Sequence, residues 1–156
     1  FLRVPAGESS SGVRMGKDKV ASKHDCNPQH RDHPAKTARC CLLFVYGTLM
    51  RGQPAHRLMR RARLLISHAT TPVGFTLYDL GPYPAAVRQG SGRVYGELYA
   101  VPSVLLRRLD TYERCPQEYQ RSKILTPRGA AWIYLYPTPP RRGHRLKHGH
   151  WRRRRS

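Results

Sequence analysis

The sequence predicts one small domain of mixed α/β or α+β type, with a sheet of about six strands and two helices. The chain has 156 residues, which suits one ordinary domain and is too short for two domains and a linker. Residues 41–46 form an apolar and aromatic run typical of a buried strand, and residues 93–101 alternate with a period of two. Residues 103–112 instead place apolar side chains at helical spacing.

The first part of this domain predicts a strand, a loop and a helix. Residues 41–46 end at Gly47, where a Tyr-Gly-Thr-Leu turn leads through Gly52 to Pro54. Proline is favoured in the first turn of a helix, so we expect a helix over the following HRLMRR. Such a loop presents backbone N–H groups toward a small anionic or carbonyl ligand. It lacks both glycine-rich nucleotide-binding fingerprints.

The remaining elements are strands and one further helix. Strands are predicted, with Gly and Pro at their breaks, over residues 69–80, 84–88, 93–101, 119–125 and 130–136. The alternation in the third of these strands places Glu97 among tyrosines on one face. Pro102 and Ser103 open a helix that brings Glu113 to its C-terminal end.

Basic residues are concentrated at the two ends of the chain. The formal net charge is +20, and twelve of these charges lie outside residues 42–137, which hold the periodic apolar pattern. We therefore predict a disordered tail over residues 1–40, a folded domain over residues 41–137 and a basic, disordered tail over residues 138–156. Such tails favour non-specific, salt-sensitive contact with polyanions.

The cysteines and the apolar runs indicate the compartment. Four irregularly spaced cysteines, two of them adjacent, do not suggest a secreted disulfide framework. We expect a cytoplasmic protein without a metal site, because the Cys and His residues from Cys26 to Cys40 match no familiar zinc spacing. No run approaches the roughly 18 apolar residues of a membrane span, and the first residues lack the apolar core of a secretory signal. A chain that begins at Phe1 indicates a fragment or an uncertain gene start.

Five segments carry a resemblance to a known family. They are FVYGTLMRGQPAHRLM, LGPYPAAV, GRVYGELYAV, LDTYERCPQEYQR and AWIYLY, all within residues 42–137. Their order and spacing resemble the γ-glutamylcyclotransferase-like superfamily, most closely the γ-glutamylamine cyclotransferases and their bacterial relatives. The resemblance implies an α+β fold with a small mixed β-barrel or sheet and two flanking helices. It also implies that the YGTL loop and the glutamate of LDxYE meet in one cavity.

The resemblance implies an enzyme, a γ-glutamylcyclotransferase that needs no cofactor and acts on a small-molecule γ-glutamyl substrate. In this family the α-amine attacks its own side-chain carbonyl, which expels an amine or amino acid and leaves 5-oxoproline. Glu113 matches the catalytic glutamate and is the expected general acid and base. The expected substrate-binding residues are Tyr46, Gly47, Thr48, Leu49 and Tyr119. The leaving group stays open among γ-glutamylamines, γ-glutamyl dipeptides and γ-glutamyl-acylated intermediates.

This chemistry requires a base matched to the substrate α-amine. An exposed Glu has a pKa near 4.3 and an α-amine a pKa near 8, so the proton transfer costs roughly 5 kcal/mol. We expect partial burial of Glu113 beside Tyr112 and Tyr119 to raise its pKa. Without the resemblance, Glu113 would be interpreted as a surface charge, and Tyr46 and Tyr119 as core residues.

Two other functions stay open on the sequence. A basic nucleic-acid-binding protein would use Trp132, Tyr134 and Tyr136, which alternate as a stacking platform would, although core packing in a strand gives the same pattern. A catalytically silent member of the fold is the second, and the presence of Glu113 argues against it. Glu97 is expected either to serve the cavity or to make a structural hydrogen bond, and we favour the structural role.

Overall fold

The computed structural model describes residues 39–153, which contain eight strands, one α-helix and two 3-10 helices. In chain order they are β1 (Cys40–Val45), η1 (His56–Met59), β2 (Arg63–Thr70), β3 (Phe75–Asp79), β4 (Pro84–Gly92), β5 (Tyr95–Pro102), α1 (Ser103–Tyr112), β6 (Gln120–Thr126), β7 (Gly129–Leu135), β8 (His144–Leu146) and η2 (Trp151–Arg153). The disordered tail predicted over residues 1–40 lies outside the described residues except for its last two, of which Cys40 begins β1. No helix in the described range is long and apolar enough to cross a membrane.

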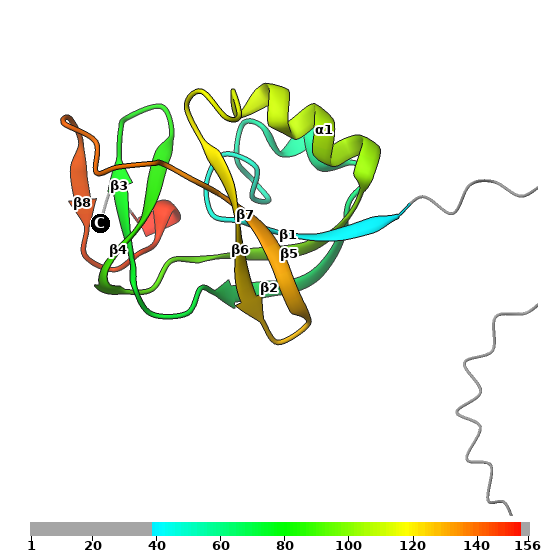
Figure 1. Cartoon of the computed structure of the whole chain (residues 1–156), viewed down its shortest axis with the longest axis horizontal. Coiled ribbons are helices and arrows are strands. Elements are labelled where there is room, and N and C mark those ends of the chain that lie inside the picture. Colours follow the sequence, from blue (N-terminus) through cyan, green and yellow to red (C-terminus); the bar gives the residue numbers. More distant parts are fainter. Residues whose placement is uncertain (1–38, 154–156) are drawn as a thin grey trace, which may run out of the picture. The chain divides into compact units, whose positions relative to one another are not determined.

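The strands form two sheets (Figure 1). The larger has the order β2-β5-β1-β7-β6, in which β1 pairs antiparallel with β5 and parallel with β7. The smaller has the order β4-β3-β8, and both of its pairings are antiparallel. The two ladders stay separate, although Tyr136 N–H donates to Ala86 O at 2.8 Å between the end of β7 and β4. The α+β class with a mixed sheet is confirmed, but the barrel that the resemblance implied is not closed.

Helix α1 packs against β5 and β1, which are two inner strands of the larger sheet. Its buried residues are Leu105, Leu106 and Leu109, at the helical spacing expected from the sequence. Burial of a leucine side chain contributes about 1.5–3 kcal/mol, so this face fixes the helix on the sheet. Glu113 N–H donates to Leu109 O at 2.8 Å, and Arg114 then takes a left-handed conformation with φ 52°. The chain therefore turns away directly after Glu113.

The other predicted helix, over the segment HRLMRR, is only the short 3-10 helix η1. The N–H groups of His56 and Leu58 bond to carbonyls three residues earlier, at 3.1 and 3.0 Å. Ala62 N–H closes the next turn onto Met59 O at 2.8 Å, and β2 already begins at Arg63. The chain thus enters strand β2 before an α-helical turn is completed.

The single strand expected over residues 69–80 is two strands in different sheets. β2 ends at Thr70 and β3 begins at Phe75, with Gly74 between them at φ 106°. Most of β2 was not predicted because its residues from Arg63 onward are largely half-buried and show no alternation. This division, together with β8, gives eight strands in the described residues instead of about six.

The basic C-terminal segment also differs from the prediction. Residues 138–156 were expected to be disordered, but within them all three residues of β8, His144–Leu146, pair with β3. Trp151 follows in η2 and is buried in the core, with 1% of its surface exposed. One large apolar side chain seated in the core offsets a composition that otherwise favours disorder. The folded domain therefore extends past residue 137.

Candidate active site

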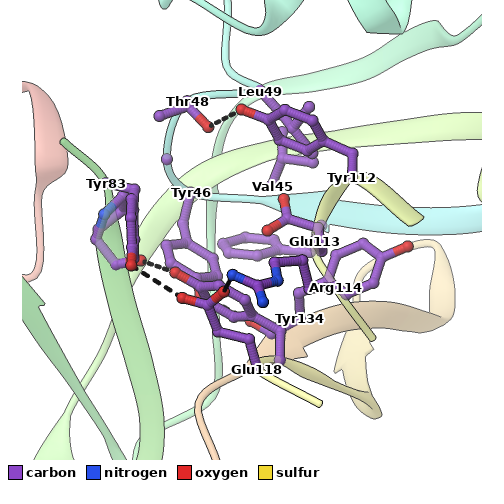
Figure 2. A pocket seen from close by; sticks show the side chains of 14 residues that line it. Val45, Tyr46, Thr48, Leu49, Tyr83, Tyr112, Glu113, Arg114, Glu118 and Tyr134 are labelled. Atoms are coloured by element: carbon purple, nitrogen blue, oxygen red, sulfur yellow. Dashed lines mark hydrogen bonds and ion pairs between the residues drawn. The ribbon is translucent and has the colours of Figure 1, made fainter. Parts of the chain in front are cut away.

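A cavity of about 270 Å³ lies where the end of β1, the end of α1 and the start of β4 meet. Figure 2 shows the side chains that line it. The lining contains all six residues expected from the sequence: Tyr46, Gly47, Thr48, Leu49, Glu113 and Tyr119. The structure thus brings the YGTL loop and the LDxYE motif together.

The loop after β1 is held by its own backbone hydrogen bonds. Met50 N–H donates to Gly47 O and Ala55 N–H donates to Thr48 O, both at 3.0 Å. A Cβ atom at Gly47 would lie 2.6 Å from Pro84 Cγ, closer than van der Waals contact allows. Glycine at this position therefore permits the loop and the first residue of β4 to approach each other.

Glu113 lies at the end of α1 with its carboxyl group in the cavity (Figure 2). Burial, aided by the nearby negative charge of Glu118, raises the pKa of Glu113 from 4.5 to about 7. A carboxyl group with this pKa is present in both protonation states near neutral pH. It can therefore accept a proton and return it without a large energetic penalty in either direction.

Two buried tyrosines fix the cavity wall. Tyr46 OH donates to Tyr134 O at 2.7 Å and accepts a hydrogen bond from Ala86 N–H at 3.3 Å. Tyr119 OH donates to Pro84 O at 2.7 Å. Burial raises the pKa of both phenols, with the charge of Glu113 adding in the same direction, so both are neutral donors. The Tyr119 proton bonds to the start of β4 and is not directed at Glu113.

Eight lining residues were not identified as site residues from the sequence, among them Tyr83, Tyr112, Arg114 and Glu118. Tyr83 OH donates to Glu118 Oε1 at 2.9 Å, and Arg114 Nη1 lies 3.6 Å from Glu118 Oε2. The hydroxyls of Thr48 and Tyr112 are 3.4 Å apart on the opposite side (Figure 2). Glu118 stands directly before Tyr119 in the segment that carries the resemblance, so its position was available as a signal.

The aromatic residues considered for nucleic-acid stacking do not form an open platform. Tyr134 is buried and its hydroxyl donates to Asp110 Oδ1 at 2.7 Å. Tyr136 packs edge-on against Tyr119, with 5.2 Å between ring centroids. Trp132 is covered by Lys123, whose Nζ lies 4.0 Å from the ring centroid. Bases would therefore find no free row of ring faces on this strand.

Glu97 does not line the cavity. It is fully buried on β5 and its carboxylate accepts hydrogen bonds from Arg51, Tyr99 and Arg152. The structural role favoured from the sequence agrees with these contacts. Its two arginine partners, Arg51 and Arg152, lie 46 and 55 residues away in sequence and were not predicted.

The amino-acid sequence of this chain is similar to a described protein family and to several known proteins. A family model described as "Gamma-glutamyl cyclotransferase, AIG2-like" matches residues 43–153, a range that includes β8 and η2. A "Putative gamma-glutamylcyclotransferase" of Vibrio cholerae is 43% identical over 110 residues, which cover 70% of this chain and 94% of that protein. The human "Gamma-glutamylaminecyclotransferase" is 42% identical over 95 residues, which cover 53% of this chain and 60% of that protein.

Solved structures agree with the sequence comparison. The solution structure of protein ytfP from Escherichia coli superposes with a TM-score of 0.59 at 37% identity, covering 72% of this chain and 97% of that one. An aig2-like protein from Mus musculus superposes with a TM-score of 0.53 at 31% identity, covering 64% and 78%.

Proposed function

The chain belongs to the gamma-glutamyl cyclotransferase, AIG2-like family, and we propose that it converts a γ-glutamyl compound into 5-oxoproline and a free amine or amino acid. The observation that carries the proposal is Glu113, a carboxyl group with a pKa of about 7 in the same cavity as the YGTL loop. Tyr46 and Tyr119 add neutral hydroxyls to the walls around it.

Glu113 is the proton carrier in the proposed mechanism. Its carboxylate takes a proton from the substrate α-ammonium, and the freed amine attacks the γ-carbonyl carbon. A nitrogen–carbon bond forms and closes the five-membered ring, Glu113 passes its proton to the leaving nitrogen, and the bond from that carbon to the leaving nitrogen breaks. The second proton of the ring nitrogen then passes through Glu113 to the released amine, which leaves as an ammonium ion. With a pKa of about 7 the mismatch with an α-amine near 8 falls to about one unit, or roughly 1.4 kcal/mol.

The loop supplies the second part of the mechanism. Its own hydrogen bonds use the N–H groups of Met50, Gln53 and Ala55, and within the described residues those of Gly47, Thr48 and Leu49 make no such backbone hydrogen bond. These groups are suited to binding the γ-glutamyl unit and to stabilising the oxyanion that forms on its carbonyl oxygen. Because the attack is intramolecular, holding the substrate in a ring-closing conformation provides much of the remaining acceleration.

The proposal is tested by incubating the purified chain with a panel of γ-glutamyl compounds. The panel contains a γ-glutamylamine, γ-glutamyl-ε-lysine and γ-glutamyl dipeptides, each also with its α-amine acetylated. We expect 5-oxoproline, detected by mass spectrometry, from at least one compound with a free amine and from none with a blocked amine. Release of the same leaving group from the acetylated compounds, or no 5-oxoproline from any member, would contradict the proposal.

A further inference from the structure

Glu97 is a buried charge at the base of the substrate loop, outside the cavity itself. It lies on β5 opposite Val45, the last residue of β1, and none of its surface is exposed. Oε2 accepts hydrogen bonds from Arg51 N–H at 3.0 Å and Tyr99 OH at 2.8 Å. Oε1 accepts from Arg51 Nε at 3.1 Å and Arg152 Nη2 at 2.8 Å. We call Glu97 and its three partners the Glu97 network.

The charge of Glu97 is well matched inside this network. Burial opposes its ionisation, but the hydrogen bonds from Arg51, Tyr99 and Arg152 outweigh burial and hold the pKa of Glu97 below its usual value. The carboxylate is therefore ionised at neutral pH and faces two guanidinium groups. Removing one partner from such a buried charge leaves part of the carboxylate without a hydrogen-bond donor, which destabilises the whole group.

The network fixes Arg51 through its backbone as well as its side chain. The N–H group of Arg51 bonds to Glu97, and its carbonyl oxygen accepts a hydrogen bond from Arg152 Nη2 at 2.6 Å. Arg51 directly follows Met50, whose N–H group closes the turn onto Gly47. A shift of Arg51 would therefore be transmitted to the turn that forms one wall of the cavity.

The other end of the network is the C-terminal segment 149–152, which is attached to the domain before it reaches Arg51. Gly149 O accepts a hydrogen bond from Tyr95 N–H at 2.9 Å at the start of β5. The ring of His150 stacks on Tyr95, with 4.1 Å between centroids and 11° between planes. Trp151 is seated in the core. These contacts fix residues 149–151 against β5 and the core. Arg152, which follows them, is therefore held beside Arg51 of the substrate loop.

We propose that the C-terminal segment 149–152 positions the substrate loop through the Glu97 network, so that Glu97 and Arg152 are positioning residues for the reaction. The inference rests on the proposed function for its catalytic consequence, but the mechanical coupling stands on the contacts alone. The network could instead serve only general stability. Its three bonds to one loop residue, Arg51, distinguish it from ordinary core packing and favour positioning.

The test is Arg152→Ala in the full chain, compared with the matched control Arg141→Ala. Arg141 is an exposed arginine of the same C-terminal stretch that takes no part in the network, so the control removes the same charge. Hydrogen–deuterium exchange is measured by mass spectrometry on peptides that cover residues 47–55 and on peptides from β6 and β7. We expect faster exchange over residues 47–55 in Arg152→Ala, with β6 and β7 unchanged and the control like the parent.

Kinetics provide the second measurement, made well below the unfolding temperature of every variant. We expect kcat/KM of Arg152→Ala to fall about tenfold, because small displacements of positioning groups are costly in rate. Arg152→Lys keeps a donor and the charge and should recover part of the loss. Because Glu97 and Arg152 act through one contact, adding Glu97→Gln to Arg152→Ala should cost less than the sum of the two separate losses.

The outcomes separate this inference from the proposed function. Unchanged exchange over residues 47–55 in Arg152→Ala, or exchange that rises equally in β6 and β7, would overturn the positioning role. Unchanged kcat/KM in that variant would overturn its catalytic consequence. If the parent forms no 5-oxoproline, the proposed function fails, whereas the exchange experiment still decides whether Arg152 holds the loop.

Discussion

Replacing Glu113 with glutamine should lower turnover strongly and, above neutral pH, stabilise the fold. Glutamine keeps the shape of the side chain but cannot accept the ammonium proton, so we expect turnover to fall by about two decades or more. The stability effect has a different origin. The folded chain raises the pKa of Glu113 from 4.5 to about 7, which means that ionising this side chain in its buried position disfavours folding.

The size and sign of the stability effect follow from the two pKa values. A raised pKa favours the folded state fully below pH 4.5, and this contribution is lost as the pH rises to about 7. The shift of about 2.5 units corresponds to roughly 3 kcal/mol. Compared with its value below pH 4.5, the difference in unfolding free energy between Glu113→Gln and the parent should grow up to pH 7 and then stay constant.

Urea denaturation of Glu113→Gln and the parent at pH 4, 6 and 8 measures this difference. The 5-oxoproline assay on the same preparations measures turnover, and circular dichroism verifies that both are folded. A stability difference that does not change with pH would show that Glu113 ionises as readily in the folded chain as in the unfolded one. Parental turnover by the glutamine variant would assign the base to another group.

Three further substitutions test the cavity walls. Gly47→Ala places a Cβ atom 2.6 Å from Pro84 Cγ, so the loop or β4 must move. We expect turnover in the 5-oxoproline assay to fall at least about tenfold. A folded variant with parental turnover would show that the position of the loop does not affect the reaction. Tyr119→Phe removes the buried 2.7 Å hydrogen bond to Pro84 O and should lower the unfolding free energy in urea by about 1–3 kcal/mol, whereas no change would mean that another donor serves this carbonyl. Glu118→Gln removes a negative charge that raises the pKa of Glu113, so the rise of kcat/KM with pH should move to lower pH; an unmoved profile would exclude that coupling.

Much of the fold was predictable because its signals are local. The alternation around Glu97 and the spacing of the buried leucines in α1 each depend on one segment, and both elements form where expected. Most of β2 was missed because its half-buried residues do not alternate. The C-terminal segment was missed because Trp151 is one apolar residue in a basic stretch, and its burial depends on core residues distant in sequence.

The candidate site was predictable to the extent that its two motifs are contiguous. Tyr46 and Glu113 each stand in a short recognisable pattern, and the cavity contains both. The bond of Tyr83 to Glu118 was not predictable, since it joins residues 35 apart whose separate surroundings carry no such pattern. The same holds for Arg152, whose role depends on a contact made 55 residues from Glu97 in sequence.

The central claim is that the bond to the leaving group is broken by the substrate's own α-amine and not by water. It is tested most directly by incubating the purified chain with an accepted γ-glutamyl compound in water enriched in oxygen-18. The molecular mass of the acidic product is then measured by mass spectrometry. Cyclisation predicts 5-oxoproline that contains no heavy oxygen, because no water oxygen enters the ring. Glutamate carrying one oxygen-18 atom in its side-chain carboxylate would show hydrolysis and contradict the account.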